Sequence, residues 1–222
     1  MIKMIELFAG IGSQTQALKN AGIAHESVAI AEIDKYALQA YEYLHGPVKN
    51  LGDISLIDPA SAPDCDLITY SFPCQDLSVA GAQLGAEEGS GTRSSLLWEC
   101  KKLIEAKKPR FLLMENVPTL LAKRHKSNFE TWISDLKELG YVSYYFQLNA
   151  SDFGLPQNRP RLLMISVFAG EDKAKENKVA AYFKGKTSKK IVKEFVASEY
   201  YKKIEIKDLL RIDYNNVKYR RE

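Results

Sequence analysis

The sequence IKMIELFAGIG at residues 2–12 predicts the opening of an α/β fold. Residues 2–8 are typical of a buried strand, and residues 10–12 are typical of a tight turn built on two glycines. A helix over residues 13–21, closed by Gly22, is expected to follow this turn. A strand, a glycine turn and a helix in that order allow backbone amides to approach a ligand closely.

The rest of the chain continues to alternate strands with helices. We expect strands at residues 28–33, 67–70, 111–114, 142–148 and 162–167. A further short strand is expected to end near Gly52-Asp53. We expect helices at residues 35–45, at 94–106 and from Ser127 to Leu139. This order predicts an open, mostly parallel sheet with helices on both faces, and it allows the closing strand pair to be antiparallel.

The helix expected at Ser127 has the clearest local signals. Ser127 and Glu130 form a predicted capping box, in which each side chain bonds the backbone amide of the other residue. An apolar stripe follows at helical spacing, and Gly140 is expected to end the helix.

Composition places the chain among soluble globular proteins. Its 222 residues are 45% hydrophobic and 27% charged, which suits one domain with a full core. No long apolar span or signal-like N-terminus is present, so we expect no membrane association. Three cysteines without metal-ligand spacing argue for a reducing compartment, the cytoplasm, and against a disulfide framework.

Charge is unevenly distributed along the chain. The net charge is +3, but residues 171–222 hold 15 Lys and Arg against 9 Asp and Glu. A basic segment on a slightly acidic body suits a polyanion partner, although charge alone fits a solvated lysine-rich tail at least as well. We therefore expect a catalytic domain over residues 1–168 and a basic C-terminal segment over residues 169–222.

Two carboxylates are expected at the ends of strands near the glycine turn. Glu32 comes twenty residues after Gly12, where an acidic side chain can take both hydroxyls of a ribose. Asp53 ends the third expected strand, where it can accept a hydrogen bond from an adenine amino group. Either carboxylate alone is better explained as a surface group. The full three-glycine dinucleotide fingerprint is absent, so together they favour an adenosine without phosphates, S-adenosylmethionine.

Cys74 follows the short expected strand at residues 67–70 within the sequence SFPCQ. Pro73 removes a backbone donor, ends the strand and stiffens the approach to the cysteine. This edge of an open α/β sheet is where ligands bind. The alternative is that Cys74 is a small buried hydrophobe, and that interpretation is kept for Cys65 and Cys100.

Charged side chains are expected near Cys74 at the same edge. Glu115 follows the expected strand at residues 111–114, although a salt bridge or a helix cap would explain it equally. Arg159 and Arg161 are two residues apart and share one face if the backbone is extended, with a structural carboxylate clamp as the alternative. The glycine-containing loop after Cys74 is a candidate to close over a substrate.

The sequence resembles the DNA cytosine-C5 methyltransferase family over residues 1–168. Seven segments carry the resemblance in the family's order. They are Phe8-Ala9-Gly10-Ile11-Gly12, Glu32-Ile33-Asp34, Gly52-Asp53-Ile54, Ser71-Phe72-Pro73-Cys74-Gln75, Arg93-Ser94-Ser95-Leu96, Glu115-Asn116-Val117 and Gln157-Asn158-Arg159-Pro160-Arg161.

The resemblance implies a Rossmann-like methyltransferase fold and a role for each matched residue. Cys74 would be the nucleophile, Glu115 would engage the base, and Arg159 and Arg161 would stabilise the adduct. S-adenosylmethionine would be the cofactor, with Phe8 against the adenine. The implied cofactor-binding residues are Phe8, Ala9, Gly10, Gly12, Glu32, Ile33, Asp53, Ile54, Pro73 and Leu96.

The resemblance also implies double-stranded DNA as the substrate, a bacterial or phage origin and a place in a restriction–modification system. Residues 171–222 match neither a target-recognition domain nor the family's last two motifs. We therefore expect a fragment or one half of a split enzyme, with a second polypeptide carrying the recognition domain. The alternatives are a tRNA cytosine-C5 methyltransferase and a non-catalytic regulatory DNA-binding relative.

Overall fold

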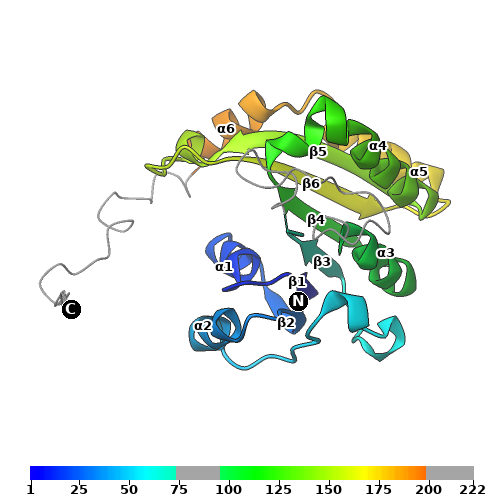
Figure 1. Ribbon diagram of the computed structural model, residues 1–222. Helices are drawn as coiled ribbons and strands as arrows, with labels where there is room; N and C mark the ends of the chain where they lie inside the picture. Colours follow the sequence, from blue (N-terminus) through cyan, green and yellow to red (C-terminus); the bar gives the residue numbers. More distant parts are fainter. Residues whose placement is uncertain (74–95, 199–222) are drawn as a thin grey trace, which may run out of the picture.

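The computed structural model describes residues 1–73 and 96–198 as one six-stranded sheet with helices on both faces (Figure 1). The strands are β1 (Ile2–Leu7), β2 (His25–Ala31), β3 (Leu67–Tyr70), β4 (Phe111–Asn116), β5 (Tyr141–Asn149) and β6 (Pro160–Phe168). The helices are α1 (Ser13–Asn20), α2 (Lys35–His45), α3 (Leu96–Lys107), α4 (Lys123–Glu138), α5 (Lys173–Phe183) and α6 (Ser188–Val196).

The strand order is β2-β1-β3-β4-β6-β5. The first four strands of this order are parallel, and β6 runs antiparallel to both of its neighbours. The expected mostly parallel sheet with an antiparallel closing pair is therefore confirmed. Parallel strands place their carboxyl ends at one edge, so the segments that follow β1, β2, β3 and β4 meet there.

Aromatic side chains fix the helices to the two faces of the sheet. The buried ring of Trp132 on α4 packs edge-on against Trp98 of α3 and Tyr70 of β3. Side chains alternate along β5, so Tyr144 stacks on Phe183 of α5 while Tyr145 faces α4 on the other side. Helices α1 and α2 lie on the face opposite α3 (Figure 1).

Two expectations about local structure need correction. The strand expected near Gly52-Asp53 is a single parallel bridge between Asn50 and Ile30, because the chain turns at Gly52 into a short 3-10 helix. The capping box at Ser127 is wrong, since α4 already begins at Lys123. Tertiary packing of the buried His125 and Phe129 extends the helix in the N-terminal direction, which local capping preferences do not report.

The C-terminal segment contains two helices that the sequence did not predict. Asp172 caps α5 by accepting from the Lys175 amide, and Thr187 caps α6 by accepting from the Lys190 amide. Both helices pack on β5. In the described parts of the chain, no helix is long and apolar enough to cross a membrane.

The corrected helix start gives a stability prediction. Asp34 caps α2 by accepting from the amides of Tyr36 and Ala37, so Asp34→Ala should lower the free energy of unfolding by about 1 kcal/mol. Ser127 is exposed inside α4, so Ser127→Ala should change it by less than about 0.5 kcal/mol. Urea unfolding of both variants measures these changes. An equal loss of unfolding free energy in both variants would indicate that Ser127 caps a helix after all.

Candidate active site

The glycine turn between β1 and α1 is strained and open. Phe8 has a φ of 55°, a left-handed conformation that costs a non-glycine residue about 1–2 kcal/mol. A side chain on Gly10 would meet no atom within 4 Å, whereas one on Gly12 would lie 2.5 Å from the ring of His45. Gly12 is therefore required for packing, and Gly10 leaves the outer face of the turn free for a ligand.

Glu32 holds the glycine turn through backbone amides. Its Oε2 accepts from the Gly10 amide at 2.7 Å, and its Oε1 accepts from the Ile33 and Asp34 amides at 2.8 Å. A carboxylate offers about four acceptor positions. In this arrangement Glu32 can therefore take a further donor on Oε2, and a bond to both hydroxyls of a ribose requires one of the amide contacts to move.

Asn50, which the sequence analysis did not single out, connects the backbone of Glu32 to the backbone of Gly52, next to Asp53. Its side chain accepts from the Glu32 amide at 3.1 Å and the Gly52 amide at 3.0 Å, and donates to the Glu32 carbonyl at 2.8 Å. Asp53 uses Oδ1 to accept from the amide and hydroxyl of Ser55. Asn50 thus fixes the backbone around Glu32 next to the segment that carries Asp53.

Apolar residues surround this polar set. Phe8 and Leu96 are half-buried against the core, Ala9 and Ile54 are buried, and Ile33 is 77% exposed. An open glycine beside two carboxylates and apolar groups suits an uncharged nucleoside, because carboxylates would repel a phosphate. The residues present therefore fit the adenosine of S-adenosylmethionine.

A second part of the edge is built around Glu115 at the end of β4. Its Oε1 lies 2.6 Å from Nε of Arg161. The Nη1 of the same guanidinium donates to the Pro160 carbonyl. The Arg159 amide donates to Asn149 at 2.8 Å, and this bond fixes the entry to β6. These charged residues line a cavity of about 160 Å³ together with Ser71, Phe72, Pro73, Asn116 and Val117.

A larger cavity of about 650 Å³ shares three of these residues. Glu115, Arg159 and Arg161 contribute to it, and Leu148, Phe153, Leu155 and Leu163 supply an apolar wall. This size and this mixture of apolar surface with a few charged groups are typical of small-molecule sites. The structure therefore brings together all the described residues of the expected catalytic set.

One side chain joins the glycine turn to the Pro73 segment. Gln14, in the first turn of α1, donates from Nε2 to the Ser71 hydroxyl at 2.6 Å. Asn116 donates to the Phe72 carbonyl at 3.1 Å and holds the same segment from β4. Cys74 lies outside the described residues but follows Pro73 directly in the chain. The expected cofactor and catalytic groups are thus neighbours along one sheet edge.

Of the other two cysteines, Cys100 is buried and Cys65 is partly buried against the core. Burial raises the pKa of the Cys65 thiol to about 12. Cys100 is fully buried, and its thiol pKa also lies well above the ordinary value for the same reason. Neither side chain forms a thiolate near neutral pH, and the thiolate is the reactive form.

Comparisons with known proteins identify the family of the chain. Residues 2–221 match the model of the family described as C-5 cytosine-specific DNA methylase. The type II methyltransferase M2.ScrFI of Lactococcus lactis subsp. cremoris is 42% identical over 220 residues, with 75% of this chain and 61% of the relative covered. The type II methyltransferase M.NgoBI of Neisseria gonorrhoeae is 40% identical over 165 residues, with 74% of this chain and 50% of the relative covered.

Solved structures show the same fold. The Dnmt2 methyltransferase of S. pombe superposes with a TM-score of 0.63 at 24% identity, over 78% of this chain and 51% of that one. An E. coli prophage protein described as a DNA modification methyltransferase superposes with a TM-score of 0.61 at 23% identity, over 76% and 47% of the two chains. The chain spans about half the length of these relatives, and it belongs to the C-5 cytosine-specific DNA methylase family.

Proposed function

We propose that the chain is the catalytic part of a DNA cytosine-C5 methyltransferase that uses S-adenosylmethionine. The observation that carries this proposal is the Glu115–Arg161 ion pair, which lines a cavity together with Pro73. The Gln14–Ser71 bond ties that cavity to the glycine turn. A base held by Glu115 would therefore lie beside a ligand held by the turn.

Cys74 is the proposed nucleophile. Its thiolate adds to carbon 6 of cytosine, forming an S–C6 bond and moving electron density onto carbon 5 and nitrogen 3. Carbon 5 is then nucleophilic enough to accept a methyl group. Bound S-adenosylmethionine supplies that methyl group on its sulfonium sulfur. Loss of the carbon 5 proton and cleavage of the S–C6 bond regenerate the thiolate and the aromatic ring.

Glu115 and the two arginines control charge during the addition. Glu115, when protonated on the oxygen that faces the base, offsets the charge that develops on nitrogen 3 by donating a proton or a hydrogen bond there, while Oε1 faces Arg161. The short contact to Arg161 fixes the orientation of the Glu115 carboxyl. The guanidinium groups of Arg159 and Arg161 can hold the carbonyl oxygen of the base and a neighbouring phosphate, and their charge favours the thiolate form of Cys74.

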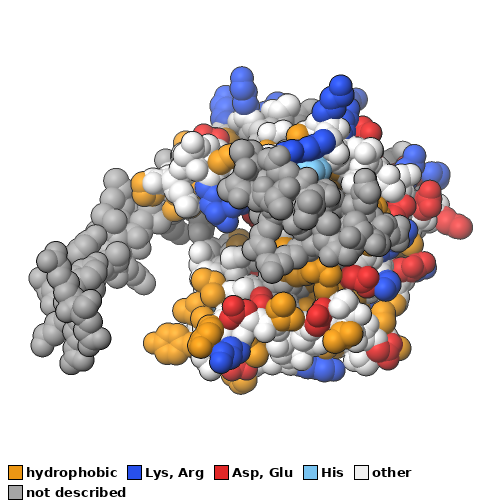
Figure 2. Space-filling view, in the orientation of Figure 1, with side chains coloured by type: hydrophobic (Ala, Val, Ile, Leu, Met, Phe, Trp, Pro, Cys, Tyr) orange, Lys and Arg blue, Asp and Glu red, His pale blue; other side chains and the backbone are white. Residues whose placement is uncertain are grey.

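Duplex DNA is the proposed substrate, in the cytoplasm of a bacterial cell or a phage host. The target base must leave the stack, at a cost of about a few kcal/mol, to reach Cys74. Lys and Arg side chains form two separate groups at the upper edge of the molecule (Figure 2). The start of α4 and the body of α6 are both rich in basic residues. Such a basic edge suits the phosphate backbone.

Sequence recognition is assigned to a further region or a second polypeptide. The support for this proposal is that the chain covers only 61% and 50% of the two curated relatives described above. The names of those relatives support a place in a type II modification system.

Replacement of the nucleophile is the first test. Cys74→Ser should abolish methyl transfer and covalent trapping on 5-fluorocytosine DNA, because a serine hydroxyl is a far weaker nucleophile. Cys65→Ser is the matched control and should retain transfer, since that thiol is partly buried and its raised pKa keeps it protonated. Wild-type turnover by a folded Cys74→Ser variant, with the fold checked by circular dichroism, would overturn the mechanism.

Cofactor binding is tested at Glu32. Glu32→Ala removes a charged acceptor and releases the Gly10 amide, so affinity for S-adenosylhomocysteine should fall by about 1.5–3 kcal/mol, or about tenfold to 150-fold. Glu26→Ala changes an exposed carboxylate on β2, the strand that Glu32 follows, and should leave affinity unchanged. Calorimetry decides, and equal affinities for all three proteins would remove Glu32 from the site.

DNA recognition is tested with the purified chain. We expect weak binding to duplex DNA that falls steeply with salt, and no preferred methylation context, because phosphate contacts carry no sequence information. Tritium-methyl transfer to duplex DNA and to tRNA separates the two substrate classes. Bisulfite sequencing then reports context, and one strongly methylated sequence would show that these 222 residues suffice for recognition.

A further inference from the structure

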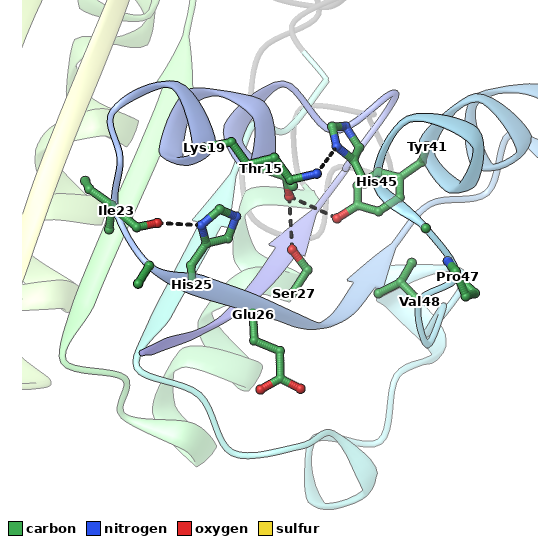
Figure 3. Close-up of a pocket in the computed structure, with 12 residues that line it drawn as sticks. Thr15, Lys19, Ile23, His25, Glu26, Ser27, Tyr41, His45, Pro47 and Val48 are labelled. Atoms are coloured by element: carbon green, nitrogen blue, oxygen red, sulfur yellow. Dashed lines mark hydrogen bonds between the residues drawn. The ribbon is translucent and has the colours of Figure 1, made fainter.

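A polar pocket of about 520 Å³ lies behind the glycine turn, between α1, α2 and the start of β2 (Figure 3). It is separate from the cavities around Glu115. Lys19 of α1, His25 of β2 and His45 of α2 line it, together with the hydroxyls of Thr15 and Tyr41. The most informative residue among these is His45, because it contacts the turn itself.

The hydrogen bonds of His45 define its protonation state. Its Nε2 lies 3.0 Å from the carbonyl oxygen of Ile11, which can only accept. Its Nδ1 lies 3.0 Å from the ammonium group of Lys19, which can only donate (Figure 3). Both contacts are satisfied together only by a neutral ring with its proton on Nε2. His45 therefore donates to the turn, and Lys19 fixes the tautomer.

Packing reinforces this bond. A Cβ on Gly12 would lie 2.5 Å from two atoms of the His45 ring, so the ring is seated directly on the turn. The ring of Tyr41, one helical turn earlier, packs edge-on against it at 4.8 Å. Gly12 is thus enclosed by α2, while Gly10 is held from the other side by Glu32.

Charges around His45 oppose its protonation. Lys19 faces it from α1 and His25 from β2, while Tyr41 contacts it from its own helix. The buried carboxylate of Glu6 on β1 lies beyond Thr15, which bonds both Glu6 and Tyr41. Burial lowers the pKa of His45, and the Lys19 charge lowers it further against the opposing effect of the Ile11 carbonyl.

The sign of the pH effect follows from this direction. A histidine whose pKa is lower in the folded state stabilises the fold above the unfolded value of about 6.5. That contribution is lost as pH falls below this value toward the folded-state pKa. Protonation would place a hydrogen on Nδ1, pointing at the Lys19 ammonium, and would move the exposed Lys19 side chain away while Nε2–H still faces the Ile11 carbonyl.

We infer that His45 is a positioning residue for the cofactor turn, holding the Ile11 carbonyl through Nε2–H in the tautomer that Lys19 fixes. This inference rests on the proposed function, in which residues 10–12 contact S-adenosylmethionine. The bond shapes the backbone between Gly10 and Gly12 and leaves the outer face of the turn free. Cofactor affinity should therefore depend on the Nε2–H donor of His45, which lies on the opposite side of the turn.

Calorimetry with S-adenosylhomocysteine between pH 5.5 and 7.5 tests the inference on the 222-residue chain. His45→Phe keeps the ring but no donor, so its affinity should be about threefold to tenfold below that of the wild type at every pH, the value of one hydrogen bond. His45→Gln keeps a donor and an acceptor, so it should bind like the wild type.

Two further variants separate this role from a general effect of charge. Lys19→Met removes the donor to Nδ1 but leaves the Nε2–H bond to Ile11, so it should bind like the wild type. His25→Gln alters the neighbouring histidine, whose Nδ1 bonds the Ile23 carbonyl, and should also bind like the wild type. Wild-type affinity in His45→Phe, or an equal loss in His25→Gln, overturns the assignment.

Nuclear magnetic resonance of the cofactor-free chain tests the His45–Ile11 hydrogen bond independently of the proposed function. Imidazole ¹⁵N shifts should report the Nε2–H tautomer at pH 7.5, and the Gly10 and Gly12 amides should titrate with His45. An Nδ1–H tautomer, or glycine amides that ignore His45, would overturn the inference. If S-adenosylhomocysteine fails to bind at every pH while these shifts behave as expected, the proposed function is wrong but the His45–Ile11 hydrogen bond is supported.

Discussion

The buried carboxylate of Glu6 is the contact on which the arrangement of the site depends. Glu6 is on β1, and it accepts from the Gln14 amide at 3.1 Å and the Thr15 hydroxyl at 2.6 Å. Burial raises the pKa of Glu6, so its ionised form costs stability as pH rises past the ordinary value. The two hydrogen bonds offset part of that cost, and in return they fix the first turn of α1 against the sheet.

The rest of the sheet edge follows from this fixed turn. Gln14 reaches Ser71 and thereby sets the Pro73 segment beside the turn. The left-handed Phe8 persists because Glu6, Glu32 and His45 hold the residues that follow it. Strain of this kind is retained where the surrounding contacts determine the backbone, and it is concentrated at functional sites. A rigid turn and a cavity with fixed charges suit a reaction that depends on positioning two substrates.

The sequence predicted most of the fold because its strongest signals are local. The glycine turn, the strand at Leu67–Tyr70 and the helix at Lys35–His45 each have clear periodicity or an identifiable cap. Asn50 and His45 were missed because their roles come from contacts between segments distant in sequence. The Ser127 capping box failed for the same reason, since tertiary packing determined where the helix began. The family motifs located Glu115 and Arg161, but only the structure showed their ion pair.

A crystal structure of the chain with S-adenosylhomocysteine tests the central claim most directly. We predict that the adenosine lies over the open face of Gly10, beside Glu32 and Asp53, and that the sulfur points toward Pro73 and the Glu115 cavity. Binding in the pocket formed by Thr15, Lys19 and His45, or at any position away from the carboxyl edge of the sheet, would contradict it.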